Sequence, residues 1–375
     1  MCHRFSLLRR LSLGLAVLVL MTLVGAPGTA ASAATANHPG SARPWTKSCQ
    51  RHQDPQRLVR CLRKHIRHEP TSRSGTSKRR QSPTISELAT PTDAAGPWGM
   101  TSGPDSALWF TENSASAVGR VTTAGAFTEY PTPTTGSGPG EIAAGPDGAL
   151  WFTESNSNNI GRISTSGSIT EYAVPTSGAF PWGIAAGSDG ALWFTEPDGN
   201  NIGRISTSGS ITEYAVPTSD AYPLNITAGP DGALWFTELL SGSIGRITTS
   251  GSVTETAVPS PSSLPIGITA GPDGALWYTD GGTSQIGTLT TAGVFTAYAL
   301  PDVFPLPWGI TTGPDGALWY TASYDNNIGR ITTSGTISEV PVPTSNADPL
   351  DISTGSDGKL WFAENGPSQI GTLTP

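Results

Sequence analysis

The chain has 375 residues, of which only 13% are charged, while 45 are Gly and 32 are Pro. Residues 34–81 carry twelve basic and two acidic side chains, whereas residues 82–375 carry six basic and 27 acidic ones. The large acidic part would repel phosphates, which excludes nucleic acid as its partner and leaves only the short basic segment suited to an anionic surface.

The N-terminus has the pattern of a secretory signal. Three Arg side chains precede an apolar run at residues 11–24, and Ala-Ser-Ala at residues 31–33 resembles a cleavage site. The apolar run is short for a membrane span, and no later run is long enough to cross a bilayer. We therefore expect residues 1–33 to be removed and the mature protein to be secreted and extracellular. Arg9-Arg10 leaves both the general and the twin-arginine export routes open.

Residues 34–83 are expected to form a basic, mostly disordered arm. Signal cleavage leaves Cys49 and Cys61 in an oxidising compartment, which favours a local disulfide. With His52 and His65 the same segment also resembles a zinc site loosely, although the middle gap is short for a zinc finger. The arm is either a solvated tether or a basic segment that adheres to an anionic cell-wall polymer or membrane surface.

A repeat of 42 residues fills the rest of the chain. Each unit has a Gly-Pro-Asp-Gly-like turn, then Ala-Leu-Trp-Phe-Thr-Glu, Ile-Gly-Arg-Ile and Ile-Thr-Glu-Tyr. Repeats of about 40 to 45 residues with four short strands are typical of β-propeller blades, and a solenoid is the competing repeat architecture. We expect strand a around Gly-Ile-Thr-Ala, followed by strands b, c and d in the three later motifs. The repeat is marked by seven Trp residues, Trp109, Trp151, Trp193, Trp235, Trp277, Trp319 and Trp361.

The two ends of the repeat favour a closed ring. Ile85 lies 42 residues before Phe127, so it belongs to an outer strand that has no blade of its own, while the chain ends just after a third strand. The N-terminal strand is therefore expected to complete the last blade, which removes the exposed edges of an open array. The prediction is an all-β, seven-bladed β-propeller at residues 84–375, and we expect it to be a monomer.

The repeated polar residues are expected to be structural. The seven Trp side chains fit the core between blades, and the turn aspartates fit acceptors for backbone N–H groups. Arg on strand c and Glu on strand d predict a cross-strand ion pair, because both are lost together in the fifth blade, at Thr288 and Ala297.

One mouth of the ring is the expected functional face, because strand a begins and strand b ends there. The starts of three a strands carry Trp98, Trp182 and Trp308, which are candidates for stacking on a ligand or for plugging the channel. In the sixth blade Ala322 interrupts a ring of carboxylates expected at this mouth, made of Glu112, Glu154, Glu196, Glu238, Asp280 and Glu364.

A cation site is a second possibility at the axis. Glu141, Asn225 and Asp351 follow the first residues of three other a strands, at a position where the four remaining blades all have Gly. Carboxylate and amide oxygens are ligands for Mg²⁺ or Ca²⁺, although the same side chains also suit a channel that holds only water.

The propeller contains no His and no Cys, since all five His residues precede it. A Ser-His or Cys-His nucleophilic pair therefore cannot form within the ring. General acid–base chemistry would fall to carboxylates, Tyr or metal-bound water.

The repeat units resemble those of the streptogramin B (virginiamycin B) lyase family in all seven blades. The similarity is carried by segments such as Pro-Trp-Gly-Ile-Ala-Ala-Gly-Ser-Asp-Gly-Ala-Leu-Trp-Phe-Thr-Glu at residues 181–196, followed by Asn-Ile-Gly-Arg-Ile at residues 201–205. The resemblance implies an antibiotic-resistance enzyme that linearises a cyclic depsipeptide by elimination across its ester bond. It also implies Mg²⁺, two His and nearby Glu residues at the mouth of the last two blades.

Carried over by motif, the two family His positions hold Trp308 and Leu350 in this chain, while Asp348 and Glu364 match the carboxylates. Elimination needs a base, which neither an indole nor an alkyl side chain supplies. We therefore expect a protein that binds a small molecule or a cell-surface polymer at the mouth. The alternative is an active lyase, or a metal-dependent lactone hydrolase, that uses Asp348 and Glu364 with Glu141, Asp351 and a divalent cation.

Overall fold

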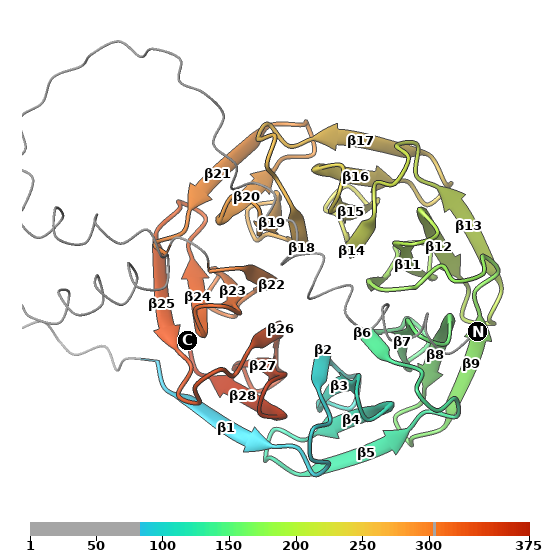
Figure 1. Ribbon diagram of the computed structural model, residues 1–375, viewed down its shortest axis with the longest axis vertical. Helices are drawn as coiled ribbons and strands as arrows, with labels where there is room; N and C mark the ends of the chain where they lie inside the picture. Colours follow the sequence, from blue (N-terminus) through green and yellow to red (C-terminus); the bar gives the residue numbers. More distant parts are fainter. Residues whose placement is uncertain (1–82, 303–304) are drawn as a thin grey trace, which may run out of the picture. The chain divides into compact units, whose positions relative to one another are not determined.

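The computed structural model describes residues 83–302 and 305–375, and the regular elements of these residues are all β-strands. The strands form seven four-stranded sheets arranged around a central axis (Figure 1). The fold is thus the predicted all-β, seven-bladed propeller. Within the described residues, no helix has the length and apolar character needed to cross a membrane. The predicted signal segment, the Cys49–Cys61 disulfide and the zinc alternative lie outside them.

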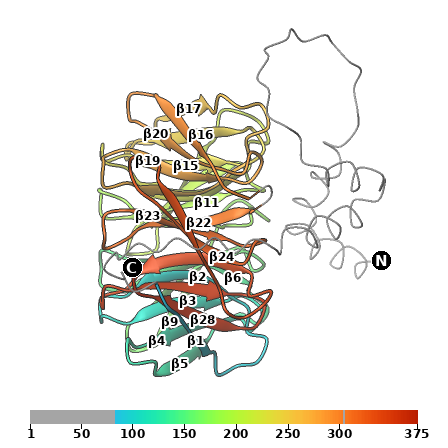
Figure 2. The same cartoon turned by 90° about the vertical axis from the view of Figure 1, so that its left-hand side faces the viewer.

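Each blade runs from the axis outward in the predicted order, and the connecting loops gather on the two faces of the ring (Figures 1 and 2). The innermost a strands are β2 (Pro97–Ser102), β6 (Pro139–Ala144), β10 (Ile184–Ala186), β14 (Pro223–Ala228), β18 (Pro265–Ala270), β22 (Pro307–Thr312) and β26 (Pro349–Thr354). The b strands are β3 (Leu108–Glu112), β7 (Leu150–Glu154), β11 (Leu192–Glu196), β15 (Leu234–Glu238), β19 (Leu276–Asp280), β23 (Leu318–Ala322) and β27 (Leu360–Glu364). The c strands are β4 (Ala117–Val121), β8 (Asn159–Ile163), β12 (Asn201–Ile205), β16 (Ser243–Ile247), β20 (Gln285–Leu289), β24 (Asn327–Ile331) and β28 (Gln369–Leu373). The outer d strands are β5 (Phe127–Pro131), β9 (Ile169–Ala173), β13 (Ile211–Ala215), β17 (Val253–Ala257), β21 (Phe295–Ala299), β25 (Ile337–Pro341) and β1 (Ile85–Ala89).

The N-terminal strand closes the ring, as predicted. All five residues of β1 pair antiparallel with β28, and Figure 1 shows β1 as the outermost strand of the last blade. On β1, Glu87 accepts hydrogen bonds from the amide (2.9 Å) and the hydroxyl (3.0 Å) of Thr344. The strand therefore covers the edge of β28, which would otherwise be open to pairing with another chain.

The second-strand Trp side chains lie in the core between blades, which confirms their structural role. Trp193 is fully buried and clusters with Ile226, Leu234 and Phe236 of the next blade. Equivalent clusters join the other neighbouring blades. Since replacing a buried aromatic side chain with Ala typically costs about 3 to 5 kcal/mol, the seven Trp residues are major contributors to the stability of the ring.

The turn aspartates organise the opposite face. Oδ1 of Asp189 accepts hydrogen bonds from the amide of Ala191 (3.4 Å) and from Nε1 of Trp193 (3.1 Å), and Oδ2 accepts one from Nε of Arg204 (2.6 Å). Burial raises the pKa of Asp189, but the hydrogen bonds from Trp193 and Arg204 outweigh it and hold the pKa below its usual value. The Arg204 guanidinium also lies 5.8 Å from the centre of the Trp193 ring.

The predicted cross-strand Arg–Glu pair is wrong. Arg204 stands opposite Thr212 in the ladder, whereas Glu213 stands opposite Gly203, so the two charged side chains project from opposite faces of the sheet. The Arg side chains bind the turn aspartates instead. Glu213 accepts hydrogen bonds from the amide (2.8 Å) and the hydroxyl (2.9 Å) of Thr176 in the neighbouring blade.

Candidate functional site

The innermost strands begin with a β-bulge in six of the seven described blades. Blades are numbered in chain order from the one that contains β2 to β5. In blade 2, made of β6 to β9, the register shifts between Pro139 and Ile142. The amide of Glu141 donates to Oγ1 of Thr153 (3.1 Å), and that hydroxyl donates to the carbonyl of Trp182 in the next blade (2.7 Å). Because a bulge releases residues from the ladder and re-aims them, the positions just after the Pro are free to face the axis.

The three candidate Trp side chains of the mouth meet one another. The ring centres of Trp98 and Trp182 are 5.2 Å apart and those of Trp98 and Trp308 are 6.0 Å apart, both edge-to-face. These residues belong to blades 1, 3 and 6, which are not adjacent, so their contacts cross the centre of the ring. Trp182 is buried and also stacks on Phe180 (5.7 Å). The cluster therefore plugs the axis at the mouth, while the half-buried Trp98 and Trp308 keep part of their surface accessible to a ligand.

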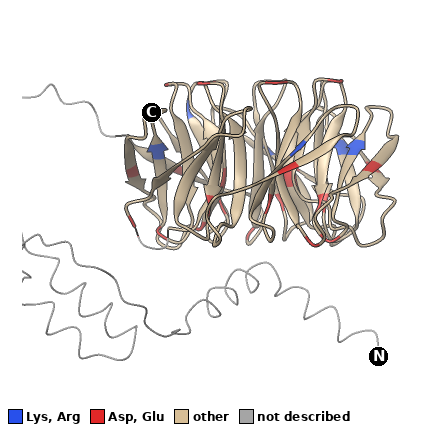
Figure 3. Cartoon of the chain, turned by 90° about the horizontal axis from the view of Figure 1, so that it is seen from above, with Lys and Arg blue, Asp and Glu red and all other residues tan. Residues whose placement is uncertain are grey.

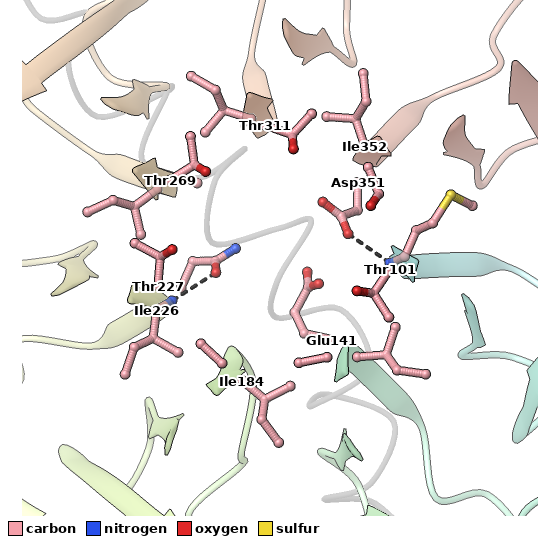
Figure 4. A pocket seen from close by; sticks show the side chains of 18 of the residues that line it. Thr101, Glu141, Ile184, Ile226, Thr227, Thr269, Thr311, Asp351 and Ile352 are labelled. Atoms are coloured by element: carbon pink, nitrogen blue, oxygen red, sulfur yellow. Dashed lines mark hydrogen bonds between the residues drawn. The ribbon is translucent and has the colours of Figure 1, made fainter. Parts of the chain in front are cut away.

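A cavity of about 330 Å³ lies along the axis and is lined by the residues that follow the mouth positions (Figure 4). Glu141 and Asp351 point toward each other in it. Asp351 Oδ2 accepts a hydrogen bond from the amide of Met100 (2.7 Å). Burial raises the pKa of Asp351 to about 6 despite this hydrogen bond, and burial together with the charge of Asp351 raises the pKa of Glu141. The pair therefore keeps at least one proton near neutral pH.

Asn225 also lines the cavity, but its Oδ1 accepts a hydrogen bond from the adjacent amide of Ile226 (2.8 Å). Across residues 83–302 and 305–375, no three His, Cys, Asp or Glu side chains are arranged to hold a metal ion. Mg²⁺ and Ca²⁺ prefer at least six oxygen ligands, so water would have to supply most of them here. The geometry favours a proton over a cation between Glu141 and Asp351, and the metal site stays a prediction.

The carboxylates at the ends of the b strands are not displayed at the mouth, contrary to expectation. Each of these Glu side chains is fully buried and lies beside a Glu of the outer strand, for example Glu112 beside Glu129. Burial, and then the charge of Glu129, raise the pKa of Glu112 to about 8. In blade 6, where Ala322 interrupts the ring, the hydroxyl of Tyr320 donates to Oε1 of Glu339 instead (2.8 Å). The five Glu residues of the ring thus form buried acid pairs, whereas Asp280 accepts hydrogen bonds from Ser263 and from loop amides.

The two catalytic candidates lie in opposite environments. Asp348 is exposed in the loop before β26. Glu364 is fully buried, neither carboxyl oxygen has a hydrogen-bond partner, and burial followed by the charge of Glu87 raises its pKa to about 8. A ligand at the mouth would reach Asp348 directly, whereas Glu364 lies beneath the surface. Their catalytic roles stay predictions.

Four side chains at the mouth project from a left-handed backbone, a feature that sequence reasoning missed. Phe180, Tyr222, Leu306 and Asp348 have φ values from 45° to 57°, and the equivalent residue is Gly in the first two blades. Left-handed geometry costs a non-Gly residue about 1 to 2 kcal/mol, and such strain concentrates at functional sites. The Gly residue that precedes Pro in blades 1 and 2 was the sequence signal for this left-handed backbone.

The model of the Virginiamycin B lyase family matches residues 71–265 and 223–375. A solved streptogramin B lyase is 38% identical, with a TM-score of 0.75, over 78% of this chain and 97% of that chain. The virginiamycin B lyase from Staphylococcus aureus is 40% identical, with a TM-score of 0.76, over 78% of this chain and 100% of that chain. A catalytically inactive His-to-Ala variant of the Staphylococcus aureus enzyme, solved with quinupristin, is 40% identical, with a TM-score of 0.75 and the same coverage. The family model and these solved structures match this chain along the propeller. This chain therefore belongs to the virginiamycin B lyase family.

Proposed function

We propose that this chain is a secreted ligand-binding propeller that lacks the His-dependent chemistry implied by its family resemblance. The observation that carries the proposal is the pair Trp308 and Leu350 at the positions where that resemblance places two His residues. Neither side chain accepts a proton from a substrate. Trp308 packs edge-on against Trp98 and Leu350 is buried, so both positions serve packing.

The first ligand to test is a cyclic depsipeptide. The relative solved with quinupristin is itself a catalytically inactive variant that lacks one His. A catalytically inactive member of this family has therefore been solved together with such a molecule. The partly accessible Trp98 and Trp308 at the mouth of the present chain suit contact with the apolar surface of a ligand of this kind.

A second candidate is an active lyase, or a metal-dependent lactone hydrolase with Mg²⁺ or Ca²⁺. It is favoured by the Glu141–Asp351 pair, because an acid with a pKa of about 6 suits proton transfer near neutral pH. In this alternative Asp348 would act at the mouth and Glu364 from its buried position beneath it. The Trp cluster argues against this enzyme candidate, because the cluster lies between the mouth and the axial cavity.

Incubation with quinupristin separates the two candidates. We expect the mature chain to bind quinupristin, seen as a change in Trp fluorescence, and to leave its ester bond intact in mass spectra with either Mg²⁺ or Ca²⁺. The Staphylococcus aureus lyase is the positive control for ring opening. Cation-dependent opening that Asp351→Asn abolishes would establish the enzyme instead, and absence of binding would refute a depsipeptide ligand.

The basic arm is proposed to hold the propeller on an anionic cell surface. We expect deletion of residues 34–82 to reduce retention on isolated cell wall by at least about tenfold at low salt, because the twelve basic residues carry the attraction. A matched variant keeps the length of the arm but replaces these twelve residues with Gln. Full retention by the Gln variant would show that charge is not the cause.

A further inference from the structure

Hydroxyl and amide groups line the axial cavity without partners in the protein. Five side-chain hydroxyls of the innermost strands lie around the axis (Figure 4), and none has a hydrogen-bond partner within residues 83–302 and 305–375. Nδ2 of Asn225 has no acceptor there either, since only Oδ1 is bonded, to the amide of Ile226 (2.8 Å). These groups are therefore available to a ligand. The hydroxyls belong to Thr101, Thr227, Thr269, Thr311 and Ser353.

Glu141 is only 7% exposed, and its carboxyl group points into the same cavity (Figure 4). Four blades have Gly at the equivalent position, so a carboxyl group is not needed to form an a strand. Blade 1 leaves room for this side chain, because a Cβ atom at Gly99 would lie 2.9 Å from Oε2 of Glu141. Burial of a carboxyl group costs free energy unless donors face it. The position therefore favours a ligand that donates hydrogen bonds.

The two ends of the cavity differ. The Trp cluster closes the axis at the mouth, whereas the last residues of the seven a strands, at the other end, are all Ser, Ala or Thr. Two of these hydroxyls bond to the backbone of a neighbouring blade: Ser102 donates to the carbonyl of Thr354 (2.9 Å), and Thr354 donates to the carbonyl of Thr312 (2.8 Å). The route into the cavity is therefore from the face of the turn aspartates.

No described Lys or Arg side chain lines the cavity. The five Arg lie on c strands, third from the axis, and Lys359 lies 3.6 Å from Asp357 in a turn (Figure 3). An anionic ligand thus has no charged partner here, and a cationic one would oppose the N–H groups of Asn225. Hydroxyl groups both donate and accept, so they match the carboxyl, amide and hydroxyl groups of the wall together.

We infer that the axial cavity is a second binding site, which takes a compact uncharged polyol of the size of a cyclitol or a monosaccharide. A volume of about 330 Å³ lies at the lower end for ligand pockets, so it suits a molecule of about six carbons rather than an oligosaccharide. The inference goes beyond the proposed function, because the polyol enters from the face opposite the mouth.

Calorimetric titration with myo-inositol, glucose, galactose and N-acetylglucosamine tests the inference. We expect the mature chain to bind at least one of them with a Kd of about 1 mM or tighter, since several hydrogen bonds within a cavity suffice for that affinity. Cyclohexanol and cyclohexylammonium have the ring of myo-inositol but lack its set of hydroxyls. Both should bind at least about tenfold more weakly than the best polyol.

Two variants remove polar groups from the wall without filling the cavity. Glu141→Gly installs the residue that four other blades carry, and it should weaken polyol binding at least about tenfold. Thr269→Val combined with Thr311→Val removes two hydroxyls at nearly constant volume and should weaken binding about tenfold as well. The matched control, Thr128→Val with Thr170→Val, changes exposed side chains of two outer strands and should bind the polyol as the parent does.

The outcomes separate this inference from the proposed function. Absence of binding by all four polyols, or unchanged binding by Glu141→Gly, would overturn it. Displacement of the polyol by quinupristin would place the polyol at the mouth and would also overturn it. Binding of Mg²⁺ or Ca²⁺ in place of every polyol would support the predicted cation site instead. The quinupristin assay without polyol decides the function of the mouth independently.

Discussion

Raising the pH from about 5 to about 8 is expected to lower the free energy of unfolding of the propeller steeply. The cause is a set of buried Glu side chains that are protonated in the folded state. Each lies beside a second Glu on the outer strand of its own blade. In blades 1 to 4 the pairs are Glu112 with Glu129, Glu154 with Glu171, Glu196 with Glu213, and Glu238 with Glu255.

The direction follows from the pKa values. Burial raises the pKa of Glu112 and Glu196 to about 8 and that of Glu154 and Glu238 to about 7, above the ordinary value of 4.5. The stability that these protons provide is complete below the ordinary pKa and is lost as pH rises through the folded pKa. Each proton held only by the folded state contributes a slope of about 1.4 kcal/mol per pH unit.

Urea unfolding at several pH values measures this slope. Replacing the four buried Glu residues with Gln should flatten the profile, because an amide also donates a hydrogen bond but does not titrate. Asp93→Asn, at an exposed side chain, should leave the profile unchanged. A four-Gln variant that keeps the slope of the parent would show that the acid pairs do not bind the protons.

Removal of β1 is expected to lower the melting temperature by about 10 °C, on the basis of about 5 kcal/mol lost from a chain of this size. A chain that begins at Pro91 lacks the five-residue ladder to β28 and the contacts of Ile85 and Leu88 with two core clusters. It also exposes the edge of β28, so it should associate at high concentration. A chain that begins at Pro83 is the matched control.

A synthetic peptide of residues 83–90 should bind the shortened chain and restore its melting temperature. The same peptide with Glu87→Ala should restore less, because Glu87 accepts two hydrogen bonds from Thr344. Calorimetry and size-exclusion chromatography follow the two effects. An unchanged melting temperature after the deletion would mean that closure adds little to stability.

The candidate site was only partly predictable. The sequence identified Trp98, Trp182 and Trp308 because they interrupt a repeat, but it did not show that they contact one another across the axis. It also assigned Glu112 and its equivalents to the surface, since the end of a strand beside a loop usually reaches solvent. In the fold these side chains are buried beside Glu residues of the outer strand, and such a contact is not visible in a local pattern.

The sequence by itself determined the fold class, the number of blades and the closure of the ring. These follow from a 42-residue period without gaps and from an unpaired strand motif at one end, both of which are local properties of the chain. Only the tertiary structure decided which charges meet. Arg204 binds Asp189 rather than Glu213, and Glu213 binds Thr176, 37 residues earlier in the chain, because strand register and blade contact select partners that spacing alone does not specify.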